Sequence, residues 1–224
     1  IQNSTIFSKI DLSEGSKLTL ENVHIEKFGN NTIHAKDSEV IAKNSTITGG
    51  DLEEDFPPVW LRNVIWESEN CKIELPTGTG ICLDNNVQFN SDSDRMTSIN
   101  SYNSMIRAHQ ATFSEYLCVY EASFASLTGE TSFLNENSKT ISFGVFDASV
   151  LMAEHMLFQN IADPNIRLQS GAFVKAGTIT YRQGDARDLT KEIEDGCDYL
   201  VGREVAKGTV QVASTGPVSD AMVA

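Results

Sequence analysis

Three ionisable side chains, His34, Glu53 and Glu74, could carry acid–base chemistry if folding brings them to one face. They occupy outward positions of successive sequence repeats, and stacked repeats would space them about 4.8 Å apart per repeat. Carboxylates about 5 Å apart suit retaining glycoside hydrolysis, and wider pairs suit inversion. A His or Glu near an Arg could instead abstract a proton beside a uronate carboxylate. The simpler interpretation, which we prefer, is that these are solvated outward residues of alternating strands.

Trp60, Tyr120 and Arg167 are the candidate ligand-binding residues. Trp60 lies one residue before a repeated apolar position, so the alternation directs its ring outward, beside an acidic loop. Aromatic faces suit the partially wet contacts that sugars make, although a subunit contact would explain an exposed Trp equally well. Tyr120 and Arg167 lie farther along the same series of outward positions.

The acidic segment 51–55 offers the hard oxygen ligands that suit Ca²⁺. It lacks the interleaved glycine spacing of known calcium loops, so we prefer a plain charged loop and expect no cofactor. The four cysteines, Cys71, Cys82, Cys118 and Cys197, fit no metal-binding spacing. We therefore expect plain thiols, assembled under reducing conditions.

The charge balance restricts the partners of the chain. Its 31 acidic residues against 17 Lys and Arg give a formal charge of −14. Such a surface repels phosphate backbones, so nucleic acid is a poor partner. The sequence has no apolar run of 18 residues, and we expect no membrane insertion.

Short repeats must position these residues. In each copy, apolar and polar residues alternate up to an apolar anchor, Asn follows two positions later, and a large apolar residue closes the copy. The four clearest copies are 17–25, 39–47, 58–66 and 80–89. Their anchors are Leu20, Ala42, Leu61 and Leu83. A recurrence at about 20 residues is the signature of a repeat architecture.

Each repeat contains three short alternating segments separated by turns, which predicts three strands per coil of a parallel solenoid. Hairpins are disfavoured because no Asn-Gly or Asp-Gly turn recurs. The corner between strands requires a left-handed backbone, which Asn tolerates well. The sequence predicts an asparagine ladder whose stacked amides hydrogen-bond along the axis. Its members would be Asn3, Asn22, Asn44, Asn63 and Asn85.

The first strand of each coil can be placed by the same alternation, and segments 32–36, 72–75 and 116–121 are three of these. Inward positions would carry ladders of large apolar residues that fill a narrow core. The aromatic members of these ladders are Trp66, Phe89, Phe113, Phe133 and Phe158. We interpret them as core residues and not as a ligand platform.

The order strand, turn, strand, Asn corner, strand and variable loop resembles the right-handed, single-stranded parallel β-helix of the pectate-lyase and phage-tailspike superfamily. The resemblance covers residues 1–182 and, loosely, 198–213. It implies an all-β right-handed parallel β-helix, with polysaccharide along the outer face of the first strands. Because this superfamily includes lyases, hydrolases, tailspikes and adhesins, the resemblance specifies fold more than function.

We expect a solenoid of about nine coils in a single domain, 1–213, followed by a tail, 214–224. An insertion, 184–197, would hold one short helix that begins at Asp188. Because the first six residues match 42–47 position for position, the chain begins within a repeat, and we expect a fragment of a longer chain.

Two function classes follow. We prefer a non-enzymatic, elongated surface or virion component, such as a phage tail fibre, tailspike or adhesin. It would act outside the cell and bind polysaccharide or partner subunits, and such spikes are often homotrimers. The alternative is a polysaccharide lyase or glycoside hydrolase acting along the first-strand face. A purely structural spacer is a third reading.

Overall fold

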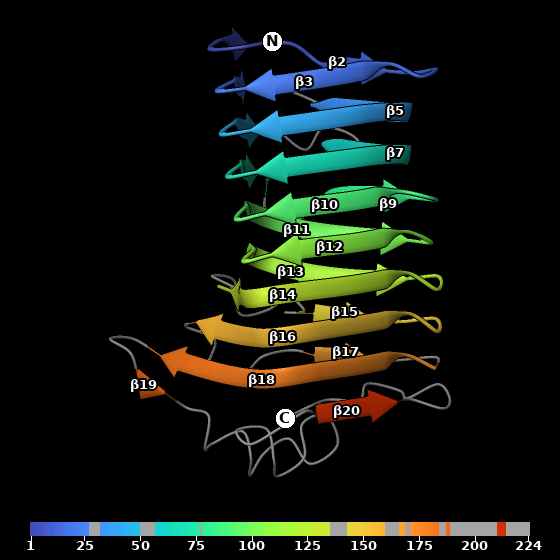
Figure 1. The fold of residues 1–224 in the computed structure, drawn as a ribbon, viewed down its shortest axis with the longest axis vertical. Helices are drawn as coiled ribbons and strands as arrows, with labels where there is room; N and C mark the ends of the chain where they lie inside the picture. Colours follow the sequence, from blue (N-terminus) through green and yellow to red (C-terminus); the bar gives the residue numbers. More distant parts are fainter. Residues whose placement is uncertain are drawn as a thin grey trace.

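The computed structural model describes residues 1–26, 32–49, 57–76, 78–134, 143–159, 166–168, 171–183, 187–188 and 210–213. Side chains are described as far as residue 178, apart from those of 166–168. This part of the chain is all-β, and its strands stack in parallel as a solenoid of about six turns (Figure 1). The predicted parallel solenoid is therefore confirmed, whereas nine coils is too many.

The strands form three faces, which we number in the order in which the chain visits them within a coil. The first face contains β2 (Ile10–Leu12), the starts of β5 (Ile33–Lys43) and β7 (Val59–Glu69), β9 (Ile81–Asp84), the ends of β11 (Arg95–Tyr102) and β13 (Thr112–Tyr120), β15 (Phe143–Val145) and β17 (Ile166–Leu168).

The second face contains β3 (Lys17–Glu21), the ends of β5 and β7, β10 (Gln88–Asp92), β12 (Met105–His109), and the starts of β14 (Phe124–Phe133), β16 (Val150–Gln159) and β18 (Phe173–Gln183). The third face contains β1 (Thr5–Ile6), β4 (His24–Glu26), β6 (Thr46–Thr48), β8 (Lys72–Glu74), the starts of β11 and β13, and the ends of β14, β16 and β18.

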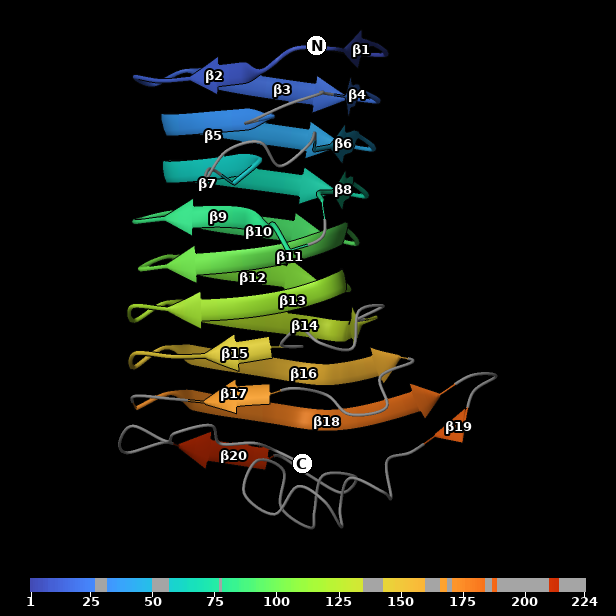
Figure 2. The same ribbon diagram turned by 180° about the vertical axis from the view of Figure 1, so that it is seen from behind.

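The parallel stack ends on two antiparallel partners of β18, namely β19 (Arg187–Asp188) and β20 (Val210–Ala213) (Figure 2). Asp188, expected to begin a helix, therefore lies in a strand. The other residues of the expected helix and the tail 214–224 lie outside the described residues. The described part of the chain contains no helix.

Left-handed residues turn the chain at two corners of each coil. Corner I joins the first and second faces, and corner II joins the second and third. All five predicted corner asparagines have φ between 47° and 58°. A left-handed backbone strains most side chains, and Asn relieves part of that strain with its short amide. The backbone conformation predicted for these residues is therefore confirmed.

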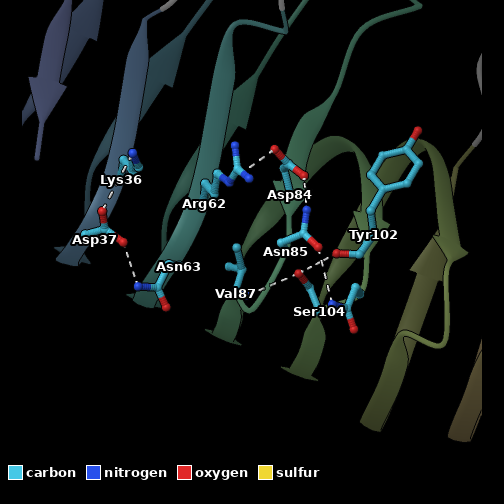
Figure 3. A network of polar contacts seen from close by, with 10 residues as sticks. Lys36, Asp37, Arg62, Asn63, Asp84, Asn85, Val87, Tyr102 and Ser104 are labelled. Carbon is cyan, nitrogen blue, oxygen red and sulfur yellow. Dashed lines mark hydrogen bonds and ion pairs between the residues drawn. The ribbon is translucent and has the colours of Figure 1, made fainter.

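A single asparagine ladder is not confirmed, because the five asparagines are divided between the two corners. At corner II the Asn22 amide donates to Asn3 Oδ1 at 3.1 Å. At corner I Asn63 donates to Asp37 Oδ1 at 2.6 Å (Figure 3). At the same corner Asn103 donates to Asn85 Oδ1 at 3.3 Å. Amide contacts between coils exist, but they form short runs in separate columns.

The predicted anchors also mix two faces. Leu61 pairs with Ala35 and Leu83 on the first face, whereas Ala42 pairs with Leu20 and Ser68 on the second. All of these side chains point inward, and all except Ser68, which is 7% exposed, have no exposed area. Because both corners need a left-handed residue just after an inward apolar one, the same local pattern arises twice per coil.

Aromatic rings fill the core, as expected. Trp66 stacks on Phe89 with ring centroids 5.7 Å apart, and Phe133 stacks on Phe113 and Phe158 at 5.4 and 5.1 Å. All five side chains are fully buried. Offset stacking between equivalent residues of adjacent coils adds to the stabilisation from burial alone.

Side-chain oxygens satisfy the backbone just inside both corners. At corner I, Ser104, Ser123 and Ser149 each accept a backbone N–H from the residue one coil earlier, at 3.1 Å. At corner II, Ser45 accepts the N–H of Val23, and Asp94 Oδ1 accepts the N–H of Cys71 at 2.7 Å. Each acceptor directly follows a left-handed residue. Buried N–H groups need such partners, so this position has its own sequence requirement.

Candidate functional site

Two parallel columns of residues, many of them polar or aromatic, follow the outer surface of the first face. The Trp60 column contains, in register, Asp11, His34, Trp60, Cys82, Asn100, Cys118 and Gly144. The Arg62 column, two residues farther along each strand, contains Lys36, Arg62, Asp84, Tyr102 and Tyr120. Alternation along a strand places residues two apart on the same side, so the two columns form one surface.

His34 and Trp60 are in direct contact on this surface. Their ring centroids are 4.5 Å apart, with the ring planes tilted by 46°. His34 Nδ1 lies 3.3 Å from Asp11 Oδ1, and Lys9 Nζ lies 2.9 Å from the same oxygen. Partial burial alone would raise the pKa of the Asp11 carboxyl, but Lys9 and His34 outweigh it, and the pKa lies below its usual value. Asp11 is therefore an ionised partner of His34.

The three predicted catalytic residues do not share one face as far as the structure describes them. Glu74 lies on β8 in the third face, where it pairs with Thr48 and makes an ion pair with Lys72 at 2.7 Å. The prediction that Glu74 shares the face of His34 is wrong, because segment 72–75 alternates like a first strand but stacks beneath β6. Glu53, together with the acidic segment 51–55, lies outside the described residues.

The three predicted binding residues are placed on the first face. Trp60 is half-buried beside His34. Tyr120 lies in the Arg62 column, stacked between Tyr102 and Phe146 with ring centroids 4.9 and 4.7 Å away. Both faces of the Tyr120 ring are thus covered, and it offers a ligand only its edge and hydroxyl. Burial raises the pKa of that hydroxyl above its usual value.

Arg167 aligns with Gly144, and therefore with the Trp60 column, through the pairing of β17 with β15. Its side chain lies outside the described residues. Gly144 has a clear steric role, since a Cβ there would come within 2.7 Å of Phe146 Cζ. The missing side chain lets the Phe146 ring lie against Tyr120.

The charged half of this surface, Lys36, Arg62 and Asp84, was not among the residues predicted from the sequence. Arg62 Nε lies 4.0 Å from Asp84 Oδ2, and Lys36 Nζ lies 4.0 Å from Asp37 Oδ2 (Figure 3). Lys36 lies two residues after His34, and Arg62 lies two residues after Trp60. That spacing within one strand was the signal that could have found them.

Two shallow depressions lie away from His34 and Trp60. One, of about 320 Å³, opens on the second face around Arg107. The other, of about 370 Å³, lies at corner I around Asn63 and Asn86. Of the groups that line the corner I depression, Asp37, Asn63 and Asn86 bond to one another, at 2.6 Å in each case, whereas the Ser38 hydroxyl has no hydrogen-bond partner among the described residues.

Metal-ligating groups, long apolar helices and thiols were considered as well among the described residues. No three of their His, Cys, Asp and Glu side chains are grouped to hold a metal ion. No helix among them is long and apolar enough to cross a membrane. Cys71 and Cys82 are free thiols, and burial raises the pKa of each to about 11. Cys197 lies outside the described residues.

Comparison with known proteins finds no family model, no curated protein and no solved structure that matches this chain. What the fold defines is a class of architecture, the all-β parallel solenoid. Any assignment of function therefore rests on the surface chemistry of this chain.

Proposed function

We propose that the chain is a non-enzymatic, elongated surface or virion component that binds glycan along its first face. Tail fibres, tailspikes and adhesins are proteins of this kind. The observation that carries the proposal is the half-buried Trp60 ring, which contacts His34. Lys36 and Arg62 lie two residues farther along the same two strands, on the same side. Such a site pairs an apolar ring with charged hydrogen-bonding groups.

The geometry suits an extended saccharide chain. Aromatic rings contact the apolar faces of sugars, while their polar edges stay wet. Neighbouring strands lie about 4.8 Å apart, so the two columns present polar groups at regular intervals along the axis. Beyond Trp60 the surface continues along the Arg62 column, first with the Arg62–Asp84 ion pair and then with Tyr102, which stacks on Tyr120.

Binding is favoured over glycoside hydrolysis because the carboxylates here suit hydrolysis poorly. Hydrolysis needs two carboxyl groups on either side of the scissile bond, one of them with a raised pKa. Asp11 is ion-paired with Lys9 and its pKa is lowered, and Asp84 faces Arg62. Glu74 is on another face. None of these is poised as a general acid.

A polysaccharide lyase is the second candidate, and the Asp11–His34 contact is the observation that favours it. An imidazole whose Nδ1 is held by a carboxylate has Nε2 available as a base. In a lyase reaction His34 would remove the proton next to a uronate carboxylate. Arg62 would then neutralise the charge that develops on that carboxylate.

The wider context belongs to the same proposal. A right-handed parallel β-helix of the tailspike-like superfamily, a location on a cell or virion surface and assembly into homotrimers are all consistent with a stiff glycan-binding solenoid. Partner subunits are the other ligands that such a component would bind. Neither a metal nor another cofactor is required for this function.

The test incubates the protein with a panel of bacterial and algal polysaccharides and follows retention and chain cleavage in the same tubes. The variants are Trp60→Ala and His34→Gln, with Phe7→Ala as the control because Phe7 is an aromatic residue that is 68% exposed. We expect Trp60→Ala to weaken retention about tenfold, as the loss of roughly 1.4 kcal/mol would. No cleavage should occur.

Each outcome has a defined meaning. Cleavage that His34→Gln abolishes would establish an enzyme and refute the non-enzymatic proposal, and an unsaturated uronate at the new chain end would identify it as a lyase. Retention that Trp60→Ala and Phe7→Ala leave equally strong would refute the first face as the binding surface. A chain that neither retains nor cleaves any polysaccharide would refute glycan binding and leave a structural spacer or a component that binds only partner subunits.

A further inference from the structure

A second ligand site is suggested by the depression on the second face. It lies on the outer side of the stacked strands β7, β10, β12 and β14 and encloses about 320 Å³. Small residues, Ser68, Ser91 and Ala108, form its floor and lie side by side in register. This volume is at the lower end of small-molecule sites, so the depression could hold one unit of a longer ligand.

Hydrogen bonds to buried groups hold the floor of the depression in place. The hydroxyls of Ser68 and Ser91 point into the protein and donate to Oδ2 of the buried Asp94, Ser91 at 2.8 Å. Trp66 Nε1 donates to Ser68 Oγ at 2.9 Å. Because these hydroxyls are bonded inward, the floor is rigid, and the polar groups available to a ligand are those of the rim. A site on a rigid platform loses little entropy when it binds.

Arg107 is the central group of the rim. It is exposed and lies in register between Asn90 and Ser126. On the same face, Glu39 holds Lys17 at 2.6 Å and Glu69 holds Lys43 at 2.8 Å. Arg107 makes no ion pair with any side chain that the structure describes. Although the chain has a formal charge of −14, the Arg107 guanidinium is therefore available to bind an anionic ligand.

The remaining rim groups are held in place around Arg107. His109 Nδ1 lies 3.0 Å from Thr128 Oγ1, and its ring passes over Gly129, where a Cβ would come within 3.2 Å of Cε1. On the β7 and β10 side of the depression, Glu67 lies in the same column as Arg107, with Asn90 between them, and Asp92 pairs with His109. Carboxylates accept hydrogen bonds from hydroxyls and repel a second anion.

We propose that this depression binds an acidic saccharide unit, with one oxyanion on Arg107 and sugar hydroxyls on Glu67 and Asp92. Guanidinium binds a carboxylate or a sulfate ester through two parallel hydrogen bonds. Asn90 and Ser126 flank that contact with neutral donors. The acidic side of the rim selects a ligand that has a single anionic group per unit among several hydroxyls. The proposal rests on the glycan-binding function but uses a different face from Trp60.

The experiment measures binding by titration calorimetry with three hexasaccharide probes: oligogalacturonate, a sulfated galactan oligomer and uncharged maltohexaose. The variants are Arg107→Gln and, as the matched control, Arg95→Gln. Arg95 is also exposed and without an ion pair to described side chains, but it lies on the third face. We expect Arg107→Gln to weaken binding of an acidic probe about tenfold to a hundredfold, with Arg95→Gln unchanged.

Comparison of the two acidic probes identifies the oxyanion, and maltohexaose should bind no better to the wild type than to Arg107→Gln. Equal losses in both Arg variants would overturn the site, because the effect would then be one of net charge. Failure of both acidic probes to bind the wild type would overturn it as well. If Trp60→Ala loses binding of the acidic probes while Arg107→Gln binds them as the wild type does, the second-face site is refuted and the first-face proposal stands.

Discussion

Asp94 is the most deeply buried carboxylate that the structure describes, and its replacement tests how the corners are stabilised. It is 1% exposed and accepts hydrogen bonds from Cys71 N–H, Ser68 and Ser91. Replacement by Ala would orphan the Cys71 N–H, at a cost of roughly 1–3 kcal/mol, and would remove two hydroxyl bonds of roughly 1 kcal/mol each. We expect Asp94→Ala to lower the free energy of unfolding by about 3–5 kcal/mol.

Asp94→Asn separates the charge from the hydrogen bonds. The amide oxygen can still accept the Cys71 N–H, and the Ser68 and Ser91 hydroxyls can rotate to accept from the new NH₂ group. This variant therefore keeps the corner bonded while removing a buried charge. We expect it to unfold at denaturant concentrations close to those of the wild type at acidic pH.

The pH dependence follows from the burial of Asp94, which raises the pKa of its carboxyl above 3.8, with the hydrogen bonds opposing this and the Asp92 charge adding to it. A raised pKa in the folded state means that the folded protein binds the proton more tightly. The resulting stability is complete below 3.8 and is lost as the pH rises through the folded pKa. Asp94→Asn carries no such loss, so its stability relative to the wild type should increase as the pH rises.

Trp66 provides the readout, because its indole donates to Ser68 next to Asp94. The chain has two Trp residues, so a Trp60→Phe background leaves Trp66 as the only indole. Urea unfolding of this background and its two Asp94 variants would be followed by fluorescence from about pH 4 to about pH 7. An unchanged pH slope in Asp94→Asn, or a cost below about 1 kcal/mol in Asp94→Ala, would refute this account of the corner.

Three further perturbations follow from local contacts. Ser123→Ala orphans the Ser104 N–H, now bonded at 3.1 Å, and should cost about 1–3 kcal/mol in urea unfolding; an unchanged midpoint would contradict the backbone role of this hydroxyl. Gly144→Ala would push the Phe146 ring off Tyr120, so the near-ultraviolet circular dichroism should weaken and the unfolding free energy should fall by about 1–3 kcal/mol. Cys82, with a pKa of about 11, should alkylate slowly in the folded protein at about pH 8, where about one thiol in a thousand is ionised; peptide mass spectrometry showing the rate of the unfolded chain would contradict this.

The sequence was sufficient to predict a parallel solenoid with left-handed asparagine corners, because period-2 alternation and Asn spacing follow from local backbone geometry. It was insufficient to assign each asparagine to a corner. Asn44 and Asn63 each follow an inward apolar residue and a basic residue, yet Asn44 is at corner II and Asn63 at corner I. Only the pairing between coils distinguishes them, and that register depends on the whole stack.

Alternation along the strands placed some candidate site residues correctly and misplaced Glu74. Trp60 and His34 were both assigned outward positions, and the structure brings their rings into contact. Glu74 was assigned to their face because its strand alternates in the same way, and the pairing with Thr48 places it elsewhere. Alternation tells which side of a strand a residue occupies. It does not tell which of the three faces that strand joins.

Some of the serines that accept backbone N–H groups just inside the corners could have been predicted from the sequence. Each follows a left-handed residue directly, as Ser45 follows Asn44 and Ser104 follows Asn103. A search for hydroxyl residues just after corner asparagines would have detected Ser45 and Ser104, but not Ser123, Ser149 or Asp94, which follow Ala122, Ala148 and Ser93. The requirement is for an acceptor that reaches a backbone N–H one coil away.

The direction of these inner bonds gives the solenoid unequal mechanical resistance along and across its axis. Each coil is bonded only to its neighbours, and both the strand ladders and the Ser149–Ser123–Ser104 series run along the axis. A pull along the axis therefore loads the outermost coil first, and coils detach one after another. A force across the axis is shared by many ladders at once. Under tension the chain would lengthen stepwise, with the corner hydroxyls of each coil helping to set the force at which that coil unwinds.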